Sequence, residues 1–160
     1  MNTKSNITFE TIDYILIAIS AFLLISTWCY VIISYDYLPE TIAVHFDAAG
    51  QPNGYNDKSS IWLAPIIFTL LIIGFIFGSK YPQEITFPHK ELSLQEKKAT
   101  SKTMLFNCNL LSSIVLLISF SMIETSLDRG FSTKWILPII LLITTAFLIG
   151  VFFYQYKIKK

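Results

Sequence analysis

Four long apolar runs dominate the pattern of hydrophobic and polar positions along the chain. Each is free of charged residues for 21 or 22 positions, and together they cover Tyr14–Tyr35, Ser59–Ser79, Thr103–Ile123 and Trp135–Tyr156. A helix that crosses a ~30 Å hydrocarbon core needs about 20 such residues. Segments such as 66–73 also lack the polar stripe that helices of a water-soluble bundle present to solvent.

The pattern therefore predicts an all-α membrane protein in which four transmembrane helices form a single bundle over residues 1–160. The expected spans are about 14–35, 60–79, 103–123 and 135–156. Between them lie an outer loop, 36–59, which has room for a small β-strand, and an inner loop, 80–102.

Composition agrees with this prediction. The chain is 53% hydrophobic and only 14% charged, whereas a soluble domain usually carries about 25% charged residues. The net charge is +1, so we expect no nucleic-acid partner. The bilayer is the one partner that the composition requires.

The basic residues predict the orientation of the helices. Three flank the 36–59 loop or the connection between spans three and four, namely Lys58, Arg129 and Lys134. The other nine lie on the opposite side: Lys4, Lys80, Lys90, Lys97, Lys98, Lys102, Lys157, Lys159 and Lys160. Because basic residues stay in the cytoplasm, we expect a multi-pass protein of the cell membrane with both termini inside and the 36–59 loop outside.

Two motifs predict how the helices begin and pack. Ser93 and Glu96 have the spacing of a capping box, so span three should begin near Leu94. Gly74 and Gly78 form a GxxxG motif, which favours close approach of another helix, either within the bundle or in a homodimer.

Polar residues on span three allow two interpretations. Asn107 and Asn109 lie within the apolar run, and Asn109, Ser112 and Ser113 share one helical face. They make either interhelical hydrogen bonds or a polar pocket. The middle of the four runs has no ionisable side chain of the kind that ion-coupled transport uses, so the first interpretation is favoured.

The outer loop is where specificity is expected. The weak alternation over Thr41–Phe46 predicts a short strand, and Asn53-Gly54 is the strongest turn signal after it. Four acidic residues oppose a single lysine in this loop: Asp36, Glu40, Asp47 and Asp57 against Lys58. Loops of this length in a compact protein are often functional.

The residues of this loop resemble a known family. Leu38-Pro39-Glu40-Thr41-Ile42-Ala43-Val44-His45-Phe46, then Gly50, Gly54 and Lys58 before a membrane helix, resemble the membrane family called domain of unknown function 1648 (DUF1648). That domain also forms the N-terminal part of SdpI-like immunity proteins. Ala43 stands where the family usually has proline, which loosens the expected loop. The resemblance covers roughly residues 10–80, and the rest of the chain fits only by layout.

The resemblance implies a role in immunity to, or sensing of, a secreted peptide toxin in a Gram-positive bacterium. It implies a peptide partner outside the cell and a repressor or membrane partner inside. Carried over to this chain, the characteristic loop positions are Pro39, His45, Phe46, Gly50, Gly54 and Lys58. Together with the loop acids Glu40 and Asp47, they are the expected ligand-binding positions. No catalytic role transfers with them.

His45 has three interpretations. Zinc sites use three or four ligands, and this loop holds one histidine, so we expect no metal and no cofactor. The ring packs beside Phe46 and bonds a loop oxygen, or its protonation makes the loop pH-sensitive. Enzymatic activity lacks a nucleophile–base pair or a phosphate loop, so we expect none. The alternative function is a small accessory or structural subunit of a membrane transporter or enzyme complex.

Overall fold

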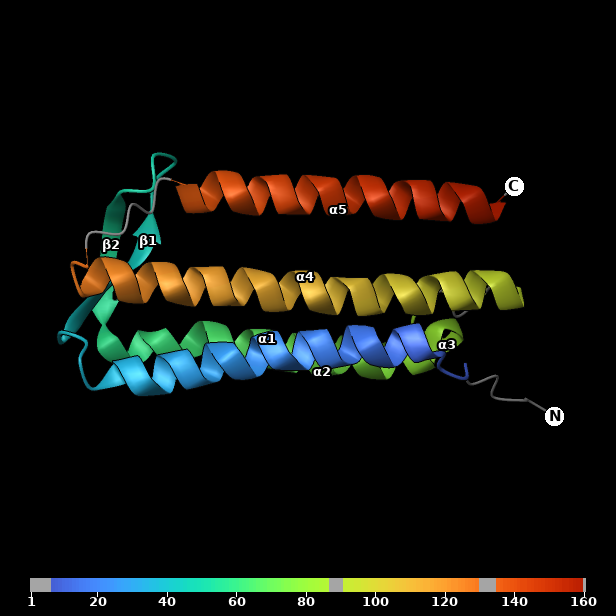
Figure 1. Ribbon diagram of the computed structural model, residues 1–160, viewed down its shortest axis with the longest axis horizontal. Coiled ribbons are helices and arrows are strands. Elements are labelled where there is room, and N and C mark those ends of the chain that lie inside the picture. Colours follow the sequence, from blue (N-terminus) through green and yellow to red (C-terminus); the bar gives the residue numbers. More distant parts are fainter. Residues whose placement is uncertain (1–6, 87–90, 130–134, 160) are drawn as a thin grey trace.

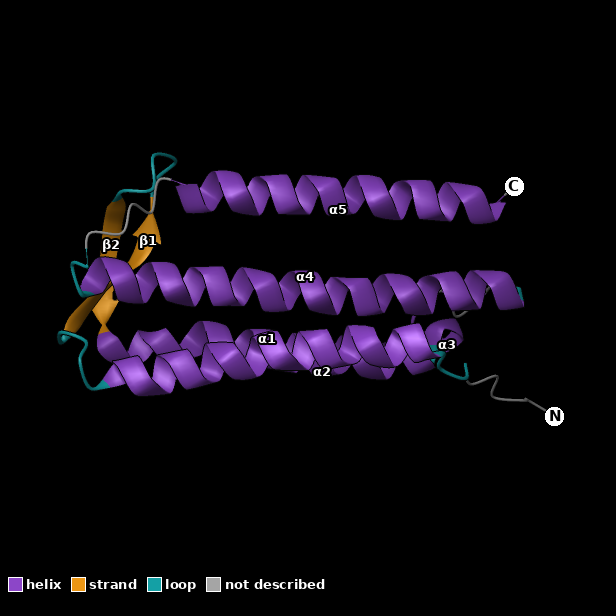
Figure 2. Ribbon diagram, viewed as in Figure 1, coloured by secondary structure: helices purple, strands orange, loops and turns teal. Residues whose placement is uncertain are grey.

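The computed structural model describes residues 7–86, 91–129 and 135–159. Long helices run side by side along the molecule, and a β-hairpin covers one end of them (Figures 1 and 2). The elements in chain order are α1 (Thr11–Tyr35), β1 (Thr41–Phe46), β2 (Pro52–Asp57), the 3-10 turn η1 (Lys58–Trp62), α2 (Leu63–Lys80), α3 (Pro82–Thr86), α4 (Leu94–Ser126) and α5 (Ile136–Lys159).

Three of the predicted spans are confirmed as helices able to cross a membrane. They are α1, the segment Lys58–Lys80 and α4, each long and apolar enough for a bilayer. In α5, a helix of 24 residues, the apolar part Pro138–Val151 is shorter. Several of its side chains fall outside the described residues, so the fourth span stays a prediction.

The helix α4 organises the bundle. It lies between α5 on one side and the pair α1 and α2 on the other (Figure 1). The α1 buried positions recur every seven residues at Asp13, Ser20, Thr27 and Ser34. Those of α4 do so at Ser101, Cys108, Val115 and Met122, and again at Leu105, Ser112 and Ser119. A seven-residue repeat of buried and mostly small side chains is the pattern of left-handed helix packing in membranes.

Polar groups inside this packing bond one helix to the next. The hydroxyls of Ser20 and Ser112 lie 2.8 Å apart across the α1–α4 interface. Asn109 donates from Nδ2 to the carbonyl of Leu16 over 3.1 Å, and Ser113 donates to the carbonyl of Asn109 within α4. The interhelical interpretation of this polar face is therefore the one that the contacts support.

The sheet differs from the prediction. The strand over Thr41–Phe46 is confirmed, but it pairs with a second strand, so the fold is not all-α. The prediction of a turn at Asn53-Gly54 is wrong, because both residues lie in β2. The chain reverses earlier, where Asp47 Oδ1 accepts the amides of Ala49 and Gln51. Gly50 adopts a φ of 76°, which favours glycine.

An apolar core anchors the hairpin to the helix ends. Ile42 of β1 is fully buried, in one cluster with Val31 and Leu38 from the α1 end, Ile61 from η1, and Met122 and Ile123 from α4. The backbone amide of Ala43 also donates to the Ser126 hydroxyl of α4 over 3.1 Å. The hydrophobic side of β1 thus attaches this strand to the helix ends, while β2 faces outward.

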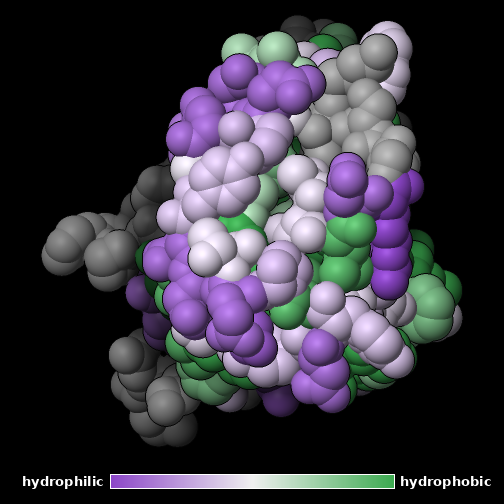
Figure 3. Space-filling model, turned by 90° about the vertical axis from the view of Figure 1, so that its left-hand side faces the viewer, coloured by the Kyte–Doolittle hydropathy of each residue, from purple (hydrophilic) through white to green (hydrophobic). Residues whose placement is uncertain are grey.

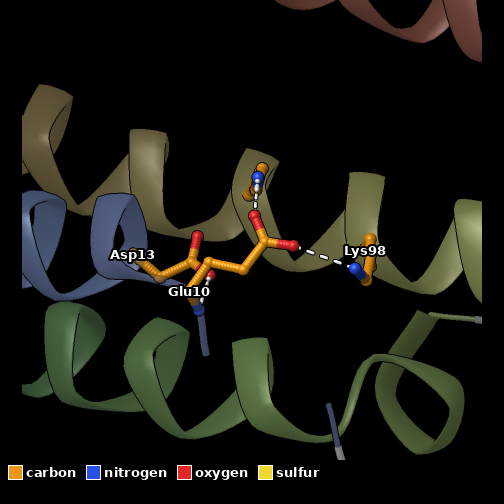
Figure 4. Close-up of polar contacts among 4 residues, drawn as sticks. Glu10, Asp13 and Lys98 are labelled. Carbon is orange, nitrogen blue, oxygen red and sulfur yellow. Dashed lines mark hydrogen bonds and ion pairs between the residues drawn. The ribbon is translucent and has the colours of Figure 1, made fainter. Parts of the chain in front are cut away.

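An ion-pair cluster joins α1 and α4 at the opposite end of the molecule. The predicted capping box of Ser93 and Glu96 is confirmed at the start of α4. Close by, Glu10 precedes α1 and accepts hydrogen bonds from Lys98 Nζ at 2.9 Å and Lys102 Nζ at 2.8 Å. Figure 4 shows the Glu10 carboxylate with its hydrogen bond to Lys98 of α4. The bonds from Lys102 and Lys98 lower the pKa of Glu10 from 4.5 to about 2.

This lowered pKa predicts an acid-dependent loss of stability. Because the folded-state pKa lies below the ordinary value, ionised Glu10 stabilises the fold above pH 4.5, and this contribution disappears as the pH falls toward 2. The decline in thermal midpoint between these pH values should be shallower for Glu10→Gln in detergent than for the native chain. Glu84→Gln, at an exposed carboxylate of α3, should keep the native slope. Equal slopes for all three proteins would contradict the assignment.

Candidate functional site

The hairpin end holds a cleft of about 380 Å³ between β1, α4 and α5, named here the hairpin cleft. Its lining comprises Val44, His45, Phe46, Asp47, Gly50, Ile114, Ile118, Ser121, Met122 and Ile140. The volume lies within the ~300–1,000 Å³ range of small-ligand sites. Seen from the hairpin end, hydrophilic residues cover much of the surface and hydrophobic patches lie between them (Figure 3).

Four of the expected loop residues meet in this cleft. They are His45, Phe46, Asp47 and Gly50. The strand β1 carries the first two, and the tight turn after it carries the others. The hairpin therefore supplies the polar side chains of His45 and Asp47 beside apolar ones, while α4 and α5 supply a mostly aliphatic wall. Such a site accepts an amphipathic ligand rather than a fully polar one.

Gly54 of β2 allows His45 of β1 to approach closely. The two residues pair across the hairpin at an irregular register. A Cβ on residue 54 would stand 2.9 Å from the Cβ of His45, closer than packing allows. Nδ1 of the ring donates to Oδ1 of Asn53, since an amide oxygen can only accept. The ring thus bonds the side-chain amide oxygen of a β2 residue, and the packing of His45 beside Phe46 stays a prediction.

The remaining loop residues close the base of the hairpin, away from the cleft. Lys58 Nζ lies 2.8 Å from Glu40 Oε1, and the backbone amide of Lys58 donates to the Glu40 carbonyl. Nζ also lies 5.7 Å from the ring centroid of Tyr35, within reach of a cation–π contact. Pro39 is exposed just before this pair. Glu40 and Lys58 thus fasten the hairpin to α1 and η1.

The hairpin keeps a negative charge beside the cleft. Hydrogen bonds from Ser59 lower the pKa of Asp57, so this carboxylate is ionised at neutral pH. Asp47 is exposed at the turn, and Glu40 is balanced by Lys58. Of these carboxylates only Asp47 lines the cleft, whereas Asp57 pairs with Thr41 at the base of the hairpin, beside Lys58. Asp47 favours a positively charged group on the ligand.

The residues expected to pack helices lie in different surroundings. Gly78 is buried against Ile85 of α3 and Met104 of α4. Gly74 is exposed, and a Cβ there would meet nothing within 4 Å. Asn109 bonds α1, and Asn107 is partly exposed. Among the described residues, no group of three or more His, Cys, Asp or Glu side chains comes together as a metal site would require.

The wall of the cleft was not predicted from the sequence. Ile114, Ile118 and Met122 of α4 and Ile140 of α5 belong to uncharged runs that are rich in aliphatic residues. Which of them face β1 depends on how the hairpin folds over the helix ends. The periodicity of the runs carries no signal for that choice.

Fold and cleft together define a helical membrane protein with a β-hairpin lid over one end of its helices. Residues 22–69 match the family model described as domain of unknown function (DUF1648), which confirms the resemblance over this segment. The matched segment runs from the first half of α1 through the hairpin into α2. It therefore covers the cleft rim but not the α4 and α5 wall.

One relative extends the similarity to most of the chain. An uncharacterized protein of Archaeoglobus fulgidus is 27% identical over 135 residues, which cover 77% of this chain and 73% of that protein. No solved structure matches the chain.

Proposed function

We propose that the chain is a four-span membrane protein that binds a secreted peptide in the hairpin cleft, and that it protects the cell from this peptide or senses it. One observation carries the proposal: the cleft joins four of the DUF1648-like loop residues to an apolar wall from α4 and α5. A peptide that acts on membranes is amphipathic, so it presents apolar and cationic groups together. The wall suits the apolar groups, and the carboxylate of Asp47 suits the cationic ones.

The proposal requires the hairpin to lie outside the cell. Nine of the basic residues belong to the opposite side, which supports cytoplasmic termini. The start of α1 and the end of α5 both lie at that opposite end (Figure 1). Four spans, with α5 as the last, accommodate this arrangement.

Cysteine labelling measures the orientation. In a chain with Cys29 and Cys108 replaced by alanine, Tyr55→Cys on β2 should react with a membrane-impermeant maleimide in intact cells. Leu94→Cys, at the start of α4, should react only after lysis. Both positions are well exposed, at 62% and 67% of their surface, so access to the reagent decides the result. The reverse pattern would invert the topology and remove the encounter with an external peptide.

A protection assay measures the function. Deleting the gene should sensitise cells to at least one peptide toxin that they or their neighbours secrete, and the native gene should restore resistance. Ile140→Trp fills the cleft from α5. It should lower the concentration of toxin that the cells survive by about tenfold or more. Ile139→Trp is the matched control, because Ile139 is 44% exposed and lies outside the cleft lining. A deletion strain with unchanged sensitivity to every peptide toxin tested would contradict the proposal.

The SdpI-like resemblance adds a signalling step on the cytoplasmic side. A repressor held at the membrane would meet the inner loop, whose lysines precede and begin α4. Two of these lysines, Lys98 and Lys102, pair with Glu10, and the repressor would bind at this end of the molecule, where α4 begins. The proposed role includes no catalysis, because binding and signalling require no reacting group.

A second candidate function is an accessory subunit of a larger membrane complex. A groove of about 270 Å³ runs along α2 beside the exposed Gly74, with Leu70, Leu71 and Phe75 in its lining. A helix of a partner or of a second copy fits such a groove. Affinity capture from mild detergent should then return one stoichiometric membrane partner. Recovery of a clean monomer, with native protection against a peptide, would favour the first function.

A further inference from the structure

Ser121 of α4 places a hydroxyl in the hairpin cleft that has no hydrogen-bond partner among the described residues. The residue is 5% exposed, and it lines the cleft together with the apolar side chains of Ile118 and Met122. The hydroxyls of Ser20 and Ser113 bond neighbouring groups inside the bundle, whereas no described residue bonds that of Ser121. A buried hydroxyl without a partner lowers stability. A ligand with a hydrogen-bonding group at this depth would therefore gain free energy from the contact.

The charge of the cleft lining selects the kind of ligand. Asp47 contributes a carboxylate, and no lysine or arginine occurs among the described residues that line the cleft. Oδ1 of Asp47 accepts the amides of Ala49 and Gln51, and Oδ2 is bonded to no described residue. The cleft therefore attracts a cation and leaves an anion without a partner. A phospholipid brings a phosphate, which this lining does not balance, whereas an amine of a peptide brings a positive charge alone.

The lower part of the cleft lies at the depth of the membrane core. On α4, Glu124 follows Lys102 by 22 positions, and none of the residues between them is charged. At ~1.5 Å per residue this stretch spans ~33 Å, close to the ~30 Å of a hydrocarbon core. Ile114 and Ile118 lie inside the stretch, about 15 and 9 Å short of Glu124 along the helix. The hairpin that carries Asp47 lies at this end of the helices (Figure 1).

We propose that the hairpin cleft binds an amine-bearing, otherwise uncharged segment of a peptide that has already entered the outer leaflet. Apolar groups of this segment pack against Ile114 and Ile118 at hydrocarbon depth. Its ammonium group lies beside Asp47, and one of its backbone carbonyls accepts a hydrogen bond from Ser121. This binding mode rests on the proposed function, which supplies the peptide and the outward position of the hairpin. It adds the part of the peptide that is bound and the route by which it enters.

Synthetic probes that share one octylamide tail test the selection of charge. Glycine octylamide is cationic, N-acetylglycine octylamide is neutral, and N-octylsuccinamic acid is anionic. With the full chain in phosphatidylcholine nanodiscs, a probe that binds raises the thermal midpoint as its concentration increases, which gives its affinity. Glycine octylamide should bind about tenfold more tightly than the neutral probe, and the anionic probe should bind least tightly. Nα-acetyllysine octylamide carries its amine on a side chain, so the tighter of the two cationic probes tells an amino terminus from a lysine.

Asp47→Asn should abolish the preference for the cationic probe while the turn persists, because Oδ1 of asparagine still accepts the two amides. Asp36→Asn is the matched control, since it removes an exposed carboxylate at the same end of the molecule but outside the cleft lining. Equal affinity of the native chain for the cationic and neutral probes, or a preference that survives Asp47→Asn, would overturn the proposal. If deletion of the gene still abolished protection, the proposed function would stand and this binding mode alone would fail.

Ser121→Ala separates a ligand contact from a structural role. The variant without ligand should keep the native thermal midpoint, because the hydroxyl bonds no described residue. Its affinity for glycine octylamide should fall about three- to tenfold, whereas its affinity for octylammonium, which has no carbonyl, should stay the same. A lower midpoint of the free variant with unchanged affinities would assign the hydroxyl to the fold and overturn its part in binding.

Spin labels test the entry from the membrane. In a chain with Cys29 and Cys108 replaced by alanine, a label at Ile118→Cys in the cleft lining should collide more with dissolved oxygen, which concentrates in hydrocarbon, than with a water-soluble nickel chelate. A label at Tyr55→Cys on β2, where the native residue is exposed, should show the reverse. A label at position 118 that collides mainly with the chelate would mean that water fills the cleft, and would overturn entry from the leaflet.

Discussion

Replacing Ile42 with alanine should destabilise the folded protein by about 2–5 kcal/mol, the range measured for large-to-small changes in cores. The side chain of Ile42 is fully buried, and it packs with Val31, Ile61 and Ile123, which come from three different helical segments. Its loss leaves a cavity where the hairpin meets the helix ends. Unfolding in increasing fractions of sodium dodecyl sulfate, followed by circular dichroism, measures the change.

The same substitution should also impair the hairpin cleft. Val44 and Phe46 of β1 pack against this core and line the cleft, so a loosened strand displaces the rim. Ile32→Ala is the control, because Ile32 lies one residue from Val31 on α1 yet is 57% exposed. Ile32→Ala should lower the free energy of unfolding by less than about 1 kcal/mol, since residue 32 faces lipid in the native chain and in this variant. Equal losses at Ile32 and Ile42 would contradict the proposed anchoring.

The helices were predictable because the bilayer constrains them strongly. A spanning segment must satisfy its backbone internally and face hydrocarbon, which leaves runs such as 14–35 unambiguous in the sequence. The start of α4 was predictable for a local reason: Ser93 and Glu96 satisfy each other's backbone amides. Neither inference depends on how distant parts of the chain meet.

The hairpin was harder to predict because its turn depends on side-chain bonds. Asn53-Gly54 has the composition of a tight turn. The chain nevertheless reverses at 47–51, because the Asp47 side chain accepts two backbone amides and Gly50 adopts the left-handed conformation. Gly54 then serves a packing purpose against His45. A glycine signal in a sequence does not distinguish conformational freedom from close approach.

The candidate site was predictable only in part. The resemblance to DUF1648 pointed to His45, Phe46 and Gly50, the acidic loop composition pointed to Asp47, and these residues line one cleft. The separation of Glu40 and Lys58 from them follows from the pairing of β1 with β2, which places the two ends of the hairpin apart. The apolar wall was beyond prediction, because lipid-facing and cleft-facing isoleucines have the same character.

Substituting leucine for the second glycine of the GxxxG motif should separate the two roles that such a motif can have. A Cβ at Gly78 would lie 2.8 Å from Ile85 Cδ1 and 3.4 Å from Met104 Sδ. The longer leucine side chain must then push aside the side chains of Ile85 and Met104. Overpacking of this kind costs about 1–3 kcal/mol, which exceeds the ~0.5–1 kcal/mol that glycine loses by its poor helix propensity.

Gly74→Leu is the comparison within the same helix, one turn away. Its side chain enters open space, so stability in the same detergent titration should stay equal or rise by up to about 1 kcal/mol. The pair therefore tests whether Gly78 packs inside the bundle while Gly74 faces the membrane. A larger loss at Gly74 than at Gly78 would mean that a second helix covers this face of α2 in the membrane, and that the homodimer or accessory-subunit interpretation describes the motif better than packing within one chain.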